Sequence, residues 1–151
     1  MKQNQTIITN SSEETQLFAE KLAQDMHGGE VICLYGDLGY GKTTFIQGFA
    51  RGLGLDGRII SPTFIIMRSY QALSKKQTLG FKTFYHIDLY RINKEQEIID
   101  LGLNEIMNNS ENIIAIEWPE KMGKLLPKNR IDIIFEYLEE DKRNIVIQEH
   151  E

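Results

Sequence analysis

Cysteine is nearly absent from this sequence, since Cys33 is the only one in 151 residues. It lies within an apolar run, which predicts a buried thiol without a disulfide partner. No run reaches the roughly 20 apolar residues that a membrane-spanning helix needs, and the polar stretch Met1–Asn10 lacks the pattern of a signal peptide. From these absences we expect a cytoplasmic location and no membrane partner.

An excess of positive charge is also missing. Asp and Glu number 22 against 17 Lys and Arg, which gives a net charge of −5. Because proteins that grip nucleic acid usually present a basic face, this balance argues against direct nucleic-acid binding. A role near RNA would then depend on a partner protein. With 41% hydrophobic and 26% charged residues, the composition is ordinary, and we expect residues 1–151 to form one domain.

One stretch fits the phosphate-binding pattern G-x-x-x-x-G-K-[ST] at every fixed position. Glycines let such a loop wrap so that backbone N–H groups point inward at an anion, and the start of the following helix adds to the attraction. The lysine then reaches the β- and γ-phosphates, and the hydroxyl holds Mg²⁺. The predicted ATP-binding residues here are Gly36, Asp37, Leu38, Gly39, Tyr40, Gly41, Lys42, Thr43 and Thr44.

The sequence around this loop has the required order of strand, loop and helix. Val31–Tyr35 is a continuous apolar run, as in a buried parallel strand. Phe45, Ile46 and Phe49 follow the loop at helical spacing. The alternative, a glycine-rich turn that carries Lys-Thr by chance, explains neither neighbour. We therefore predict that the chain binds a nucleoside triphosphate.

Apolar runs elsewhere predict further strands and helices. Ser11 and Glu14 form the pattern of a capping box for a helix that continues to about Met26. Strand-like runs at 63–70 and 81–89 predict a hairpin. The other predicted elements are a strand at 6–9, a helical stretch opening at 93–97 with apolar contacts from Ile98, Ile99, Leu101 and Leu103, a buried strand at 113–116, and strands at 131–138 and 144–148. Together they predict an α/β fold, a P-loop NTPase domain with a mixed, mostly parallel sheet flanked by helices and containing antiparallel hairpins.

Two acids follow predicted strands, where open α/β sheets bind their ligands. Glu117 ends the run at 113–116, and Asp88 ends a run in which period-2 alternation places Phe84, His86 and Asp88 on one face. A phosphate loop needs an acid on the metal side of its site, and both positions qualify. The alternative is that each acid only caps a strand at the surface. His86 we interpret as a hydrogen-bonded structural group.

Other loop motifs bear on the nucleotide. Ser61 and Thr63 offer hydroxyls after the phosphate-loop helix, where related folds often carry a γ-phosphate-sensing switch, although turn chemistry explains them equally well. The guanine-reading pattern Asn-Lys-x-Asp does not occur, and neither does an Asp-x-x-Gly after a strand. Adenine is therefore the favoured base.

Four motifs follow one another along the sequence: Gly36–Phe45, Ser61–Phe64, His86–Arg91 and Glu117–Pro119. In this order and spacing they resemble the TsaE family, small bacterial ATPases of the tRNA threonylcarbamoyladenosine pathway. The resemblance covers nearly the whole chain. It departs at Tyr40, where the family usually has alanine, and a ring there could alter access to the site.

The resemblance implies low intrinsic, Mg²⁺-dependent ATPase activity in complex with the TsaB–TsaD pair. That pair transfers a threonylcarbamoyl group to the adenosine next to the anticodon of ANN-decoding tRNAs, so tRNA would be met only through the complex. ATP hydrolysis would reset the complex between turnovers. By matching positions, the resemblance assigns Mg²⁺ to Thr43 and Glu117, hydrolysis to Asp88, a switch-like loop to Thr63, and the border of the adenine to Ser11 and Arg130.

The first hypothesis is thus an ATPase in which Lys42 and Mg²⁺ neutralise developing charge and Asp88 orients or activates water. The alternative is a small-molecule or nucleotide P-loop kinase, which usually needs an arginine-bearing lid, and the arginines of this sequence do not cluster in such an insertion. A third hypothesis is a nucleotide-gated binding module whose hydrolysis is incidental.

Overall fold

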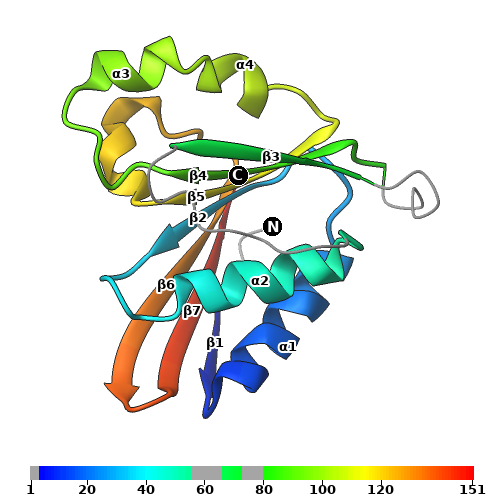
Figure 1. The fold of residues 1–151 in the computed structure, drawn as a ribbon, viewed down its shortest axis with the longest axis vertical. Coiled ribbons are helices and arrows are strands. Elements are labelled where there is room, and N and C mark those ends of the chain that lie inside the picture. Colours follow the sequence, from blue (N-terminus) through cyan, green and yellow to red (C-terminus); the bar gives the residue numbers. More distant parts are fainter. Residues whose placement is uncertain (1–3, 56–65, 73–79) are drawn as a thin grey trace.

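The structure is a computed structural model, and it describes residues 4–55, 66–72 and 80–151. Its described residues form seven strands in one sheet, with helices on both faces (Figure 1). The strands are β1 (Asn4–Thr9), β2 (Val31–Tyr35), β3 (Met67–Gln71), β4 (Thr83–Asp88), β5 (Asn112–Glu117), β6 (Arg130–Glu139) and β7 (Lys142–His150). The helices are α1 (Ser12–Gln24), α2 (Lys42–Gly52), α3 (Glu95–Asp100), α4 (Leu103–Met107) and the 3-10 helix η2 (Pro119–Leu125).

The strand order is β1-β7-β6-β2-β5-β4-β3. The four central strands β6, β2, β5 and β4 run parallel, whereas β1, β7 and β3 join their neighbours antiparallel. This confirms the predicted mixed sheet with its parallel centre and its two hairpins, β3–β4 and β6–β7. The first part of the predicted strand at 63–70 lies outside the described residues, as do Ser61 and Thr63.

The central strands are apolar because both of their faces are covered. Ile32 and Leu34 of β2 pack with α1 and α2 on one face, and Val31 and Cys33 pack with α3, α4 and η2 on the other. Figure 1 shows these two helical layers on opposite sides of the sheet. Burial raises the pKa of the Cys33 thiol to about 12, as expected for the buried, inert thiol that the sequence predicts.

Helix α1 begins as predicted at Ser11, whose hydroxyl accepts the Glu14 N–H at 3.1 Å. The second half of the predicted capping box forms one residue earlier, because the Glu14 carboxylate accepts the N–H of Asn10 at 2.9 Å instead of that of Ser11. Among the described residues, no helix is long and apolar enough to cross a membrane.

The helical stretch after residue 93 is two short helices, α3 and α4, separated by Gly102 at a φ of 72°. Ile98 and Leu103 are buried as predicted, but Ile99 is 49% exposed. The prediction for Ile99 was wrong because consecutive residues of a helix point about 100° apart, so the neighbour of a buried Ile98 faces outward.

Helices α1 and α2 approach closely because two glycines of α2 face α1. A Cβ on Gly48 would lie 2.3 Å from the Gln16 carbonyl oxygen, and a Cβ on Gly52 would lie 2.3 Å from that of Glu20. Backbone atoms cannot move aside as a flexible side chain can, so only glycine fits at these two contacts. This close packing sets α2, and therefore the loop that precedes it, against the sheet.

We predict that Gly48→Ala lowers the free energy of unfolding by about 1–3 kcal/mol, because the added methyl group overpacks the α1–α2 contact. In an exposed helix interior, alanine is more favourable than glycine by about 1 kcal/mol. A decrease in the free energy of unfolding would therefore point to overpacking, whereas an increase would reflect helix propensity alone. Chemical denaturation measures the change. Gln24→Ala at an exposed position of α1 is the control, expected within about 0.5 kcal/mol of the parent. An equally stable Gly48→Ala variant would contradict the packing argument.

Candidate functional site

The predicted phosphate loop connects β2 to α2 at the carboxyl end of the parallel strands. Asp88 and Glu117 are register partners at the ends of β4 and β5, and Glu117 also pairs with Leu34 of β2. The sheet therefore brings both predicted acids to the edge that carries the loop. This is the edge at which open α/β sheets bind ligands.

The loop has the shape of an anion-binding nest. Gly39 and Gly41 adopt φ values of 80° and 99°, a backbone conformation that residues with side chains rarely adopt. Gly41 is the N-cap of α2 and offers no side chain to the first-turn N–H groups. Those N–H groups consequently remain available to a ligand, together with the positive end of the helix dipole.

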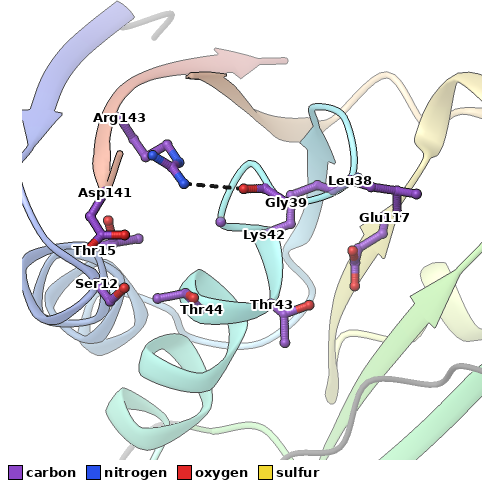
Figure 2. Close-up of a pocket in the computed structure, with 11 residues that line it drawn as sticks. Ser12, Thr15, Leu38, Gly39, Lys42, Thr43, Thr44, Glu117, Asp141 and Arg143 are labelled. Carbon is purple, nitrogen blue, oxygen red and sulfur yellow. Dashed lines mark hydrogen bonds between the residues drawn. The ribbon is translucent and has the colours of Figure 1, made fainter. Parts of the chain in front are cut away.

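A pocket of about 210 Å³ opens in front of this loop. Figure 2 shows Glu117 reaching toward it from β5 and Ser12 and Thr15 bordering it from the side of α1. The lining residues are Ser12, Thr15, Leu38, Gly39, Gly41, Lys42, Thr43, Thr44, Glu117, Asp141 and Arg143.

Lys42 is the most unusual group in the pocket. Its side chain is buried, with 4% of the residue exposed, and its ammonium has no hydrogen-bond partner among the described residues. The Nζ atom lies 4.2 Å from the centre of the Trp118 ring. Burial lowers the pKa of Lys42, while the nearby Glu117 and Asp88 carboxylates oppose that shift. A buried cation with unused donors, beside an uncapped helix start, fits a phosphate group.

Glu117 is buried beside His86. His86 Nε2 lies 2.7 Å from Glu117 Oε2, and His86 is fully buried. This confirms the interpretation of His86 as a hydrogen-bonded group, and it adds a partner that the sequence did not reveal. The bond fixes one oxygen of the carboxylate that the sequence predicts as a metal ligand.

Asp88 is less buried than Glu117. Its Oδ1 atom accepts the Tyr90 N–H at 3.0 Å, and burial raises the pKa of its carboxyl, against the opposing effect of that hydrogen bond. Glu117 is not a surface cap of the kind considered as the alternative, because it is 4% exposed, whereas Asp88 is only half-buried.

Trp118 follows Glu117 in a left-handed backbone conformation, with φ 59° and ψ 49°. Such a conformation costs a residue with a side chain about 1–3 kcal/mol, and strained residues cluster at functional sites. The ring packs against Tyr90, with 5.1 Å between ring centres, and lies beneath the Lys42 ammonium. The sharp turn thus ends β5 and supplies an aromatic surface to the site.

Oxygen donors suited to Mg²⁺ line the same pocket, namely the Thr43 hydroxyl and the Glu117 carboxylate. In the part of the chain that the structure describes, no group of three or more histidine, cysteine or acidic side chains could hold a metal ion. A cation at this place would therefore need phosphate oxygens and water as further ligands, which is how Mg²⁺ is usually held beside nucleotides.

The two residues predicted to border the adenine, Ser11 and Arg130, do not line this pocket. Ser11 caps α1, and its neighbours Ser12 and Thr15 line the pocket instead. The structure does not bring Arg130 to the loop. It is the first residue of β6, next to Ile131, which pairs with Ile32 near the amino end of the parallel strands. Its Nε atom donates to Asp132 at 3.0 Å. The parallel register of β6 with β2 explains this placement.

Two lining residues, Asp141 and Arg143, were not predicted. Asp141 lies in the turn between β6 and β7, and Arg143 lies near the start of β7. Of the remaining loop residues, Gly36, Asp37 and Tyr40 do not line the pocket, and the Tyr40 ring instead packs against Tyr137, 5.9 Å away. A signal for these contacts would have required the strand register, which links positions about one hundred residues apart.

Comparison with known proteins gives consistent matches. A family model described as "Threonylcarbamoyl adenosine biosynthesis protein TsaE" matches residues 9–145. A protein of Rickettsia bellii named tRNA threonylcarbamoyladenosine biosynthesis protein TsaE is 40% identical, over 95% of this chain and 93% of its own. Its Bacillus subtilis namesake is 38% identical, over 91% of this chain and 80% of its own. The crystal structure of Bacillus subtilis YdiB superposes with a TM-score of 0.79 at 31% identity, covering 100% of this chain and 88% of that one.

We predict that His86→Phe lowers the apparent affinity for Mg²⁺ in nucleotide binding by about 10- to 100-fold, because the Glu117 carboxylate loses the group that orients it. His86→Gln should retain part of that affinity, since an amide can still donate to the carboxylate. Titration of Mg²⁺ at fixed nucleotide concentration, followed calorimetrically, measures both. Phe84→Leu on the same face of β4 is the control for packing; a Mg²⁺ dependence that His86→Phe leaves unchanged would refute the orienting role.

Proposed function

This chain belongs to the TsaE family, and from that premise we propose that it is the ATP-binding and ATP-hydrolysing component of a tRNA threonylcarbamoyladenosine modification machinery. The observation that carries the proposal is the buried Lys42 ammonium, which has no hydrogen-bond partner among the described residues and stands beside an uncapped helix start. That combination favours phosphate over any neutral ligand.

In the proposed reaction the loop N–H groups and Lys42 bind the β- and γ-phosphates and stabilise the charge that develops on them. Mg²⁺, when held by the Thr43 hydroxyl and Glu117, would supply further positive charge beside those phosphates. Asp88 orients or activates the attacking water. The raised pKa of its carboxyl makes it a better proton acceptor than an exposed aspartate, and its register pairing with Glu117 at the ends of β4 and β5 supports this role.

We further propose that the chain works with TsaB and TsaD and meets tRNA only through them, so that ATP hydrolysis permits multiple turnovers of the modification. The net charge of −5 supports an indirect contact with tRNA. Residues 1–151 would act as one Mg²⁺-dependent ATPase domain of low intrinsic activity in the cytoplasm. In this scheme Thr63, outside the described residues, belongs to a switch-like loop.

We predict that Lys42→Ala and Glu117→Ala each lower phosphate release from ATP at least 100-fold, because each removes a charge that acts on the phosphates or their metal. Phosphate release by the purified chain, alone and with TsaB, TsaD and tRNA, measures the effect. Lys124→Ala, at an exposed position, is the control and should release phosphate as the parent does.

Full activity in both variants would sink the assignment of this site. The γ-phosphate appearing on a small acceptor instead of in free phosphate would favour the alternative, a small-molecule or nucleotide P-loop kinase. Slow release by the chain alone, with multiple-turnover tRNA modification only when this chain and ATP are present, is the result expected for the proposed function.

A further inference from the structure

The phosphate loop is bonded by an arginine of the distant β6–β7 hairpin, which also lines the edge of the pocket. Arg143 Nε donates to the Tyr40 carbonyl at 3.1 Å, and one terminal nitrogen donates to the Gly39 carbonyl at 3.2 Å. Figure 2 shows the guanidinium reaching from the start of β7 to the loop carbonyl. Both acceptors are backbone groups, so the contact depends on the shape of the loop and not on its side chains.

The same guanidinium is itself fixed in place. It lies 4.8 Å from the centre of the Tyr137 ring, and its third nitrogen donates to the carbonyls of Glu140 and Lys142 within the hairpin turn. The turn is closed by the Glu140 N–H, which donates to the Tyr137 hydroxyl at 2.9 Å. Arg143 is therefore held in place by contacts within its own hairpin.

A second contact joins the hairpin to the loop. The Tyr40 ring lies 5.9 Å from the Tyr137 ring, at an interplanar angle of 32°. Tyr137 thus touches both Tyr40 and Arg143, and the three side chains form one cluster, which we term the hairpin brace. Tyr40 occupies a variable position of the phosphate-binding pattern, so the pattern does not require an aromatic residue there.

We propose that Arg143 is a positioning residue that holds the phosphate loop in its anion-binding shape. In such a loop the N–H groups must face inward, which turns carbonyl groups outward. Arg143 binds two of these outward carbonyls with charge-assisted hydrogen bonds. Glycines such as Gly39 and Gly41 lose much conformational entropy when they become ordered. A loop that is already ordered before binding loses less conformational entropy when the ligand binds.

This proposal rests on the proposed function, because it assumes that the loop binds a nucleotide. It goes beyond that function in making the affinity of the loop depend on a residue about one hundred positions away. Arg143 acts through the loop backbone in this account, not through the reacting phosphates. If Arg143 acts through the loop backbone, its loss should loosen the loop even without nucleotide. If it acts by direct contact with the phosphates, the loop without nucleotide should be unchanged.

The test uses the full chain with Arg143→Gln, Arg143→Lys and the control Lys142→Gln, which removes the same charge one position earlier. Calorimetry gives the Kd for ATP with Mg²⁺, and amide hydrogen exchange without nucleotide reports the order of residues 36–43. We expect Arg143→Gln to raise the Kd at least about tenfold, as the loss of one charge-assisted hydrogen bond predicts. It should also speed exchange in the loop while exchange in β2 and β5 stays unchanged.

Arg143→Lys should fall between the parent and Arg143→Gln, since an ammonium cannot reproduce the planar fork that meets two carbonyls at once. Lys142→Gln should match the parent in both measurements. A higher Kd for ATP without faster loop exchange would mean that Arg143 contacts the nucleotide directly, which overturns the proposal. Faster exchange throughout the sheet, or faster loop exchange with an unchanged Kd, would overturn it as well.

Failure of this inference can be told apart from failure of the proposed function. The exchange measurement requires no hydrolysis, so a parent chain that binds ATP without releasing phosphate would refute the ATPase and leave the brace testable. A double-mutant cycle of Tyr40→Ala and Tyr137→Ala tests the aromatic arm. We expect a coupling of about two- to tenfold in the Kd for ATP, and additive effects would remove the rings from the hairpin brace.

Discussion

A buried lysine ammonium is the constraint on which the rest of this site depends. Taking a lone cation out of water is costly, and in most interiors the group would lose its proton instead. Here burial lowers the pKa of Lys42, but the Glu117 and Asp88 carboxylates oppose that shift, and an aromatic face lies 4.2 Å from Nζ. The acids support the charge while its donors remain free for an anion.

The sheet makes this arrangement possible. Parallel strands have their carboxyl ends on the same side of the sheet. The loop after β2, Glu117 at the end of β5 and Asp88 at the end of β4 therefore lie together although they are far apart in the sequence. Glycines in α2 let that helix lie close against α1 on one face of the sheet. The electrostatic site is thus a consequence of strand order and helix packing.

Local patterns were sufficient to predict the loop, the buried strands β2 and β5 and the position of both acids at strand ends, because each depends on a few neighbouring residues. Long-range contacts could not be predicted in this way. The bond between His86 and Glu117 depends on the register of β4 against β5. The position of Arg130 at the amino end of the parallel strands depends on the direction of β6. Ile99 failed for a different reason, since an apolar residue in a short helix need not face the core.

The loop is glycine-rich and would be flexible by itself, yet it is held on two sides by elements that are remote in sequence. On the inner side, Trp118 accepts a strained backbone and places its ring under Lys42. On the outer side, the hairpin brace binds the loop carbonyls. A motif of eight residues therefore specifies what the loop can bind, whereas the surrounding fold determines how much of that capacity is ready for use. If the brace acts as we propose, relatives that share the motif can differ in nucleotide affinity through residues outside it.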